Sequence, residues 1–179
     1  MRATGVVRRI DDLGRIVIPK EIRRTMRMRE GDPLEIFTEQ NGEIVLKKYS
    51  MMRQISSFGQ SFADGLSKVS GLACRVCDTD KVVSYAGRGK REILNNPITK
   101  EAEEVMTSRT SYFKAFPTEK NIYVCGRCPL CAVGIVPVIS AGDCVGAVAL
   151  LGEPGRTLSD CAKKLLVLTA TLLAGSAEG

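Results

Sequence analysis

Histidine and tryptophan are both absent from the 179 residues, and aromatic residues make up only 5%. Without histidine, the chain cannot build a Ser-His-Asp or Cys-His catalytic set. A bound metal would need cysteine or carboxylate ligands. No apolar run approaches the ~18 residues of a membrane-spanning helix, and the first residues lack the apolar segment of a signal peptide. We therefore expect a cytoplasmic protein without membrane contact.

Positive charge is concentrated at the N-terminus. Residues 1–29 hold nine Lys and Arg but three Asp and Glu, whereas the remaining residues hold 17 of each sign. The first 29 residues therefore account for the whole net charge of +6. Such asymmetry favours an N-terminal segment that binds a polyanion such as nucleic acid. The alternative is a basic face that is merely solvated.

The first fifty residues read as a small β-rich unit. Residues 6–10 and 15–18 are β-prone and flank a turn at 11–14, and a short helix is expected from Lys20 to Met26. A hairpin is expected at 34–47 around Gln40-Asn41-Gly42. About fifty residues without a cysteine or a metal motif bury too little apolar surface to be stable alone. We therefore expect this unit to complete its core with a second copy.

The remaining residues, 51–179, have the pattern of an α+β domain. Helices are expected at 52–69, 97–108 and 157–174. Five strands are expected at 73–78, 82–86, 121–125, 132–140 and 144–151. Because strands and helices alternate over about 125 residues, we expect one sheet with flanking helices.

The first helix of this domain carries one apolar stripe with steps of three and four residues, formed by Ile55, Phe58, Phe62, Leu66 and Val69. One interpretation is a helix packed on its own domain. The other is a seam between subunits that extends the assembly beyond a dimer. Both can hold at once, so both stay open.

The segment from Thr4 to Arg24, TGVVRRIDDLGRIVIPKEIRR, resembles the DNA-binding domain of the AbrB family of bacterial transition-state regulators. The similarity continues through Gly31-Asp32-Pro33-Leu34-Glu35-Ile36 to Lys47-Lys48-Tyr49. It implies a swapped-hairpin homodimer through residues 1–50, in which the strands of two chains interleave.

The same resemblance implies contacts to duplex DNA by Arg8, Arg15, Arg23 and Arg24. The guanidinium fork suits both phosphates and guanine edges. Arg9 and Lys20 are expected to strengthen the positive electrostatic potential of the head. AT-rich, loosely defined targets fit a head that reads DNA shape and deformability. The expected site of action is therefore the nucleoid.

Residues 51–179 resemble the stage V sporulation protein T subgroup, which joins this head to a GAF-like sensor domain. The resemblance implies a homotetrameric activator or repressor of sporulation-type genes. The activity of this regulator would respond to an unknown small-molecule ligand. Small antitoxins share the head, but they carry short, disordered tails instead of a patterned domain. Some GAF domains are thiol-dependent methionine sulfoxide reductases, yet the fused head argues against an enzyme.

All seven cysteines follow the head. Cys161 is expected in the core of the last helix and Cys144 in a structural position. The spacing Cys125-x-x-Cys128-x-x-Cys131 could hold zinc or an iron–sulfur cluster, with Cys74 or Cys77 as a further ligand. A thiol redox switch, with Arg127 lowering a thiol pKa, is the second alternative. Structural thiols without a metal are the third.

Overall fold

The computed structural model describes residues 4–50, 52, 56–88, 93–126 and 128–177. The chain divides into two compact units, Met1–Tyr49 and Ser50–Gly179. We call the first unit the head and the second the C-terminal domain. Among the described residues, no helix is long and apolar enough to cross a membrane.

The head contains one short helix and one hairpin. Helix α1 spans Lys20–Thr25, and strands β1 (Leu34–Thr38) and β2 (Ile44–Lys48) pair antiparallel. The hairpin turn is closed by the Glu39 amide, which donates to the Glu43 carbonyl at 2.9 Å. Gly42 takes a positive φ of 81° there, as the Asn-Gly pair predicts. The predicted hairpin and helix are both confirmed.

The two predicted N-terminal strands, 6–10 and 15–18, are not strands in the described single chain. The predicted turn between them does form, and one bond joins its flanks, from the Asp11 amide to the Arg15 carbonyl at 3.1 Å. A β-strand needs a neighbouring strand to satisfy its backbone groups. β-propensity alone therefore does not produce strands at these positions within one chain.

The C-terminal domain is built on a five-stranded antiparallel sheet with the order β4-β3-β7-β6-β5. Its strands are β3 (Ala73–Asp78), β4 (Val82–Ala86), β5 (Tyr112–Phe113), β6 (Cys131–Ser140) and β7 (Asp143–Gly152). Its helices are α3 (Ser56–Ser70), α4 (Lys100–Ser108) and α5 (Asp160–Ala177). The predicted α+β class is confirmed.

One strand prediction is wrong. Residues 121–125 do not form a strand, and the fifth strand is the two-residue β5. Ile122 makes an isolated bridge to Ala132, whereas Cys125 makes one to Ile98. Because the segment bonds to a different partner at each end, no continuous ladder develops along it.

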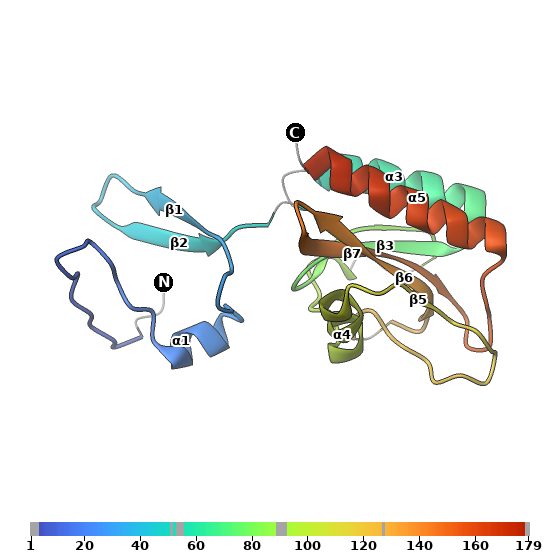
Figure 1. Ribbon diagram of the computed structural model, residues 1–179, viewed down its shortest axis with the longest axis horizontal. Coiled ribbons are helices and arrows are strands. Elements are labelled where there is room, and N and C mark those ends of the chain that lie inside the picture. The colour runs from blue at the N-terminus through green and yellow to red at the C-terminus, as the bar shows by residue number, and fades with distance from the viewer. Residues whose placement is uncertain (1–3, 51, 53–55, 89–92, 127, 178–179) are drawn as a thin grey trace. The chain divides into compact units, whose positions relative to one another are not determined.

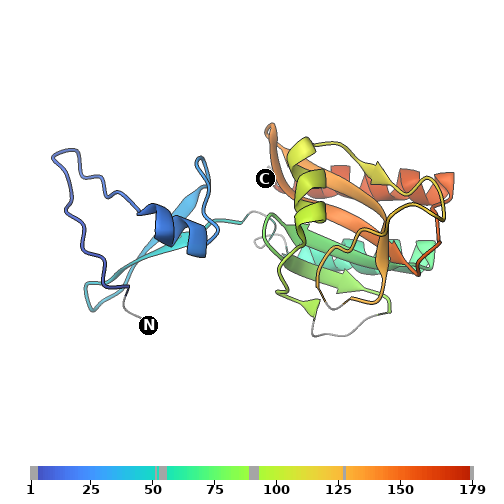
Figure 2. The same cartoon turned by 90° about the horizontal axis from the view of Figure 1, so that it is seen from below.

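The sheet separates two apolar layers. Helices α3 and α5 lie side by side over one face, and α4 lies over the other (Figures 1 and 2). Leu66 of α3 and Leu166 of α5 pack against Val76 and Leu150 of the sheet. Ala102 and Met106 of α4 pack in the second layer. Alternate residues of β3 enter alternate layers, because successive side chains of a strand point to opposite faces.

The side chains of the predicted apolar stripe on α3 do not share one environment. Leu66 is buried and Phe62 packs against the core. Phe58, in contrast, is 59% exposed and Val69 71% exposed. Ile55 lies outside the described residues. Packing within the domain thus accounts for part of the stripe and leaves two apolar side chains uncovered.

Candidate nucleic-acid interface and thiol cluster

The six basic side chains predicted to meet DNA are all exposed on the head. Arg8 and Arg9 precede the turn at 11–14, and Arg15 follows it. The other three belong to α1: Lys20, Arg23 and Arg24. Among the described residues, Arg15 forms an ion pair and the other five have no carboxylate partner. These five cations are therefore available to an external anion.

Asp11 organises the turn that carries Arg15. Its carboxylate accepts from the Arg15 amide at 2.7 Å, from the Leu13 amide at 3.1 Å and from the Arg15 Nε at 2.8 Å. The backbone bond from Arg15 is the main cause that holds the pKa of Asp11 below its usual value. Gly14 completes the turn with a φ of 75°. Asp11 thereby fixes the direction of the Arg15 guanidinium.

Helix α1 places two arginines in succession. Pro19 precedes it and cannot donate, which suits the start of a helix. Arg23 and Arg24 occupy its last turn, where a positive charge is favourable beside the carbonyl end of the helix dipole. The chain then turns back, and the Met28 amide donates to the Arg23 carbonyl at 2.7 Å.

The head has no buried core of its own. Among residues 4–49, all described, none is buried. Ile36 is 67% exposed, and its cross-strand partner Leu46 is 36% exposed. Eight further large apolar side chains are exposed: Val6, Val7, Ile10, Leu13, Ile16, Val17, Met26 and Ile44. This is a large apolar surface for so small a unit, since soluble monomers rarely expose extended apolar patches.

The structure does not bring the five candidate metal ligands together. Cys74 lies in the apolar layer beneath α3 and α5, whereas Cys77, Cys125 and Cys128 lie in the opposite layer. The Cys131 thiol donates to the Gly152 carbonyl at 3.5 Å. Among the described residues, no group of three or more Cys, Asp or Glu could hold a metal ion.

The last two cysteines differ from each other. Cys144 is half-buried at the start of β7. Cys161 is exposed, so its predicted place in the core is wrong. The next residue, Ala162, points into the core instead, because the buried face of α5 continues through Leu166 and Leu173. The apolar periodicity of a helix does not by itself predict whether a cysteine next to the apolar stripe lies on the buried or the exposed face.

Arg75, which the sequence analysis missed, is fully buried in β3. Its guanidinium donates to the carbonyls of Cys74 at 2.8 Å, Ala86 at 3.2 Å and Arg88 at 3.4 Å. It lies 5.5 Å from the centre of the Tyr85 ring, and its Nε has no hydrogen-bond partner among the described residues. The signal in the sequence that could have identified Arg75 was a charged residue between two cysteines in a mostly apolar strand.

Arg75 acts on the thiol pair Cys125 and Cys128. These two thiols share a hydrogen bond, which lowers the pKa of Cys128 and, together with burial, raises that of Cys125. The backbone at Leu130 and the Arg75 guanidinium lower the pKa of Cys128 further. Burial raises the pKa of Cys74 to about 12 and also raises that of Cys77. Cys128 is thus the thiol of this group whose thiolate is favoured.

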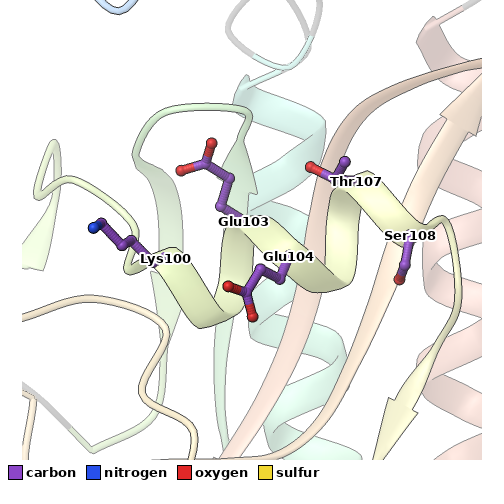
Figure 3. A pocket seen from close by; sticks show the side chains of 5 residues that line it. All are labelled: Lys100, Glu103, Glu104, Thr107 and Ser108. Carbon is purple, nitrogen blue, oxygen red and sulfur yellow. The ribbon is translucent and has the colours of Figure 1, made fainter.

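A surface hollow of about 480 Å³ borders α4. Figure 3 shows its lining residues, Lys100, Glu103, Glu104, Thr107 and Ser108, which all come from this one helix. Lysine at one end and two glutamates beside it give the hollow a mixed charge. Because a single helix forms its wall, it does not enclose a ligand as a small-molecule site usually does.

Comparison with known proteins identifies both units. Residues 54–178 match the family described as stage V sporulation protein T C-terminal, transcription factor. Residues 7–54 match the family described as antidote-toxin recognition MazE, bacterial antitoxin. The chain is 38% identical to stage V sporulation protein T of Bacillus subtilis (strain 168), over 99% of both chains. It is 42% identical over 71 residues to the transition state regulatory protein AbrB of the same organism, covering 40% of this chain and 73% of AbrB.

The C-terminal domain also has the fold of solved GAF domains. It superposes with a TM-score of 0.54 on the GAF domain of Acinetobacter phosphoenolpyruvate-protein phosphotransferase, at 14% identity, covering 71% of this chain and 90% of that one. The resemblances to AbrB regulators and to a GAF-like domain are both confirmed. The matched family is one of transcription factors, not of enzymes. The chain therefore belongs to the stage V sporulation protein T family and is a DNA-binding transcriptional regulator with a C-terminal GAF-like domain.

Proposed function

We propose that residues 1–50 bind duplex DNA as a swapped-hairpin homodimer and that residues 51–179 carry the signal input and further assembly. The observation that carries the proposal is the head itself, which combines ten exposed large apolar side chains with nine exposed basic ones among its described residues. A second chain is needed to cover the exposed apolar side chains. An anion is needed to balance the charge of the exposed basic side chains.

The DNA contacts follow from the placement of the basic residues. Arg8 and Arg15 flank the turn held by Asp11, and Arg23 and Arg24 follow one another on α1. In a dimer each position occurs twice, so eight guanidinium groups can reach phosphates and base edges. Arg9 and Lys20 add to the field. Recognition rests on AT-rich DNA shape more than on a fixed base code.

The proposed site of action is the nucleoid in the cytoplasm, at promoters of sporulation-type genes that the protein activates or represses. The GAF-like domain would bind a small-molecule ligand. Binding of that ligand to one state of the domain would shift the population of DNA-competent assemblies.

The DNA proposal is tested by measuring binding to an AT-rich duplex over a range of salt concentrations. Each phosphate neutralised by Lys or Arg contributes about −0.9 to the slope of log K against log salt. We expect a steep negative slope and a stoichiometry of two chains for each bound duplex site. A slope near zero, or binding by monomers, would contradict the proposal.

We also propose that the C-terminal domains join two head dimers into a tetramer through the outer faces of α3 and α5. These helices lie side by side on one face of the sheet (Figure 1). Their outward apolar side chains remain exposed: Phe58 and Val69 on α3, and Val167, Leu168 and Leu172 on α5. Phe62 and Leu66, which belong to the predicted stripe, contribute from beneath by fixing α3 on its own core.

Replacing Phe58 and Val69 together by Asp should convert the tetramer into a dimer. Both side chains are exposed within the domain, so the change removes intersubunit contact without opening the core. Sedimentation of the full chain measures the mass. Ser57→Asp and Lys68→Asp, which replace exposed polar neighbours on the same helix, form the matched control and should leave the tetramer intact. An unchanged mass for the apolar double variant would exclude this face as the interface.

A further inference from the structure

We infer that the C-terminal domain binds a small monocarboxylate with an apolar body on the α4 side of its sheet, where Arg75 of β3 holds the carboxylate. The inference rests on the proposed small-molecule binding by this domain and names the chemical class of the ligand. Three observations carry it: the buried charge of the guanidinium, the edge on which its unused donors lie, and the apolar lining around it.

The side chain of Arg75 leaves β3 on the side that α4 covers. Its chain neighbours Cys74 and Val76 pack in the layer beneath α3 and α5. Ala73 and Cys77 pack in the opposite layer, beneath α4. Since successive side chains of a strand point to opposite faces, Arg75 lies on the same side as Ala73 and Cys77. Helix α4 covers this face of the sheet (Figure 2), so a molecule held by Arg75 lies between the sheet and α4.

The guanidinium of Arg75 carries a buried positive charge that no described carboxylate balances. The side chain is fully buried. Its hydrogen-bond acceptors within the described part of the chain are the carbonyl oxygens of Cys74, Ala86 and Arg88. A buried charge is costly unless an opposite charge compensates it. One cation compensates the single negative charge of a carboxylate, whereas a phosphate group carries nearly two.

The unused donors of Arg75 lie on one edge of the guanidinium, which has five N–H groups in all. Nη1 uses both of its hydrogens, on the Cys74 carbonyl at 2.8 Å and the Ala86 carbonyl at 3.2 Å. Nη2 makes the longest bond, 3.4 Å to the Arg88 carbonyl, and Nε has no partner among the described residues. Nε and Nη2 share one edge of the group. This edge can therefore donate to both oxygens of a carboxylate, which is the bidentate geometry that arginine favours.

Apolar side chains line the layer around this edge. The cross-strand neighbours of Arg75 are Tyr85 of β4 and Ala149 of β7. The centre of the Tyr85 ring lies 5.5 Å from the guanidinium, whereas the Ala149 side chain ends at its methyl group. Ala102 and Met106 of α4 are buried in the same layer. Small-molecule sites combine such an apolar lining with a few polar groups that fix the orientation of the ligand. The body of the bound carboxylate should therefore be small and apolar.

The first test measures the melting temperature of the full-length protein in acetate, propanoate and isovalerate, at constant sodium concentration. A ligand that binds the native state raises the melting temperature as its concentration increases. We expect affinity to rise along this series, by about fourfold for each added carbon, because each one buries apolar surface. Isovaleramide is the neutral isostere of isovalerate and serves as the matched control. It should bind at least tenfold more weakly, because it brings no negative charge to the guanidinium.

Each contrary outcome is distinct. Equal stabilisation by isovaleramide would overturn the carboxylate assignment and leave small-molecule binding by the domain intact. Stabilisation by inorganic phosphate but by none of the three carboxylates would also overturn it, since the site would then take a different anion. No stabilisation by any of the carboxylates contradicts the inference. DNA affinity and sedimented mass, measured on the same samples without ligand, report separately on the rest of the proposed function.

Two variants separate Arg75 from a general effect of buried charge. Arg75→Met should weaken isovalerate binding at least tenfold, because it removes both donors and the charge. Lys114 is the other fully buried cation among the described residues, and its ammonium donates to the Asn121 Oδ1 at 2.6 Å. Lys114→Met is therefore the matched control and should keep the response of the parent. An undiminished response in Arg75→Met would overturn the assignment.

A measurement on the parent protein decides the question if Arg75→Met does not fold. In deuterated full-length protein with isotope-labelled arginine, the Nε–H of the fully buried Arg75 should exchange slowly with water, unlike that of the exposed Arg156. Saturation with isovalerate should shift the slowly exchanging Nε–H signal downfield, because this N–H gains an acceptor. The Arg156 signal should stay in place. A buried Nε–H signal that does not move at saturation would contradict the inference.

Discussion

Replacing Arg23 and Arg24 together by Ala should lower affinity for duplex DNA by about a hundredfold or more. Each guanidinium that contacts a base edge or phosphate contributes about 1–3 kcal/mol, and both positions occur twice in the proposed dimer. Alanine favours a helix at least as well as arginine, so α1 should persist. Fluorescence anisotropy at fixed salt measures the loss, and the salt dependence should become less steep.

The matched control for this variant is Arg156→Ala, which removes an exposed arginine from the C-terminal domain. It changes the net charge without touching the head and should leave DNA affinity nearly unchanged. Arg15→Ala is a less clean probe, because Arg15 also holds Asp11 through a 2.8 Å ion pair. Equal affinities of the double variant and the parent would remove Arg23 and Arg24 from the proposed site.

Replacing Ile36 by Asp should abolish the head dimer and, with it, DNA binding. Ile36 is 67% exposed in the single chain and lies opposite Leu46 on one face of the hairpin. In an interleaved dimer this face becomes core, where an unpaired carboxylate costs several kcal/mol. Because the C-terminal contacts remain, the full chain should sediment as a dimer instead of a tetramer and fail to bind the duplex.

Gln40→Asp supplies the control, since it introduces the same charge at an exposed position of the hairpin turn. It should retain the tetramer and lower DNA affinity only slightly through added repulsion. If Ile36→Asp keeps the parent mass and the parent affinity, the exposed apolar face of the hairpin is not the dimer core.

Local patterns predicted the elements whose partners are close in sequence. The β1–β2 hairpin, the neighbouring strands β6 and β7, and helix α4 are such elements, because turn or capping residues lie within a few positions of each. The edge of the sheet was predicted wrongly, because the choice between residues 121–125 and β5 depends on which segment reaches β6.

The sequence by itself determined the two-part organisation, the basic head and the family resemblance, and it predicted a second chain for the head, since each depends on composition, spacing or size. The tertiary structure decided which cysteines meet. It buries Arg75 in β3, sends Cys74 to the layer opposite that of Cys125 and Cys128, and turns Cys161 to the surface. These relations join residues that are far apart in the chain, or depend on which face of an element is buried. No local periodicity encodes them, because they arise only when the strands pack into one sheet between two apolar layers.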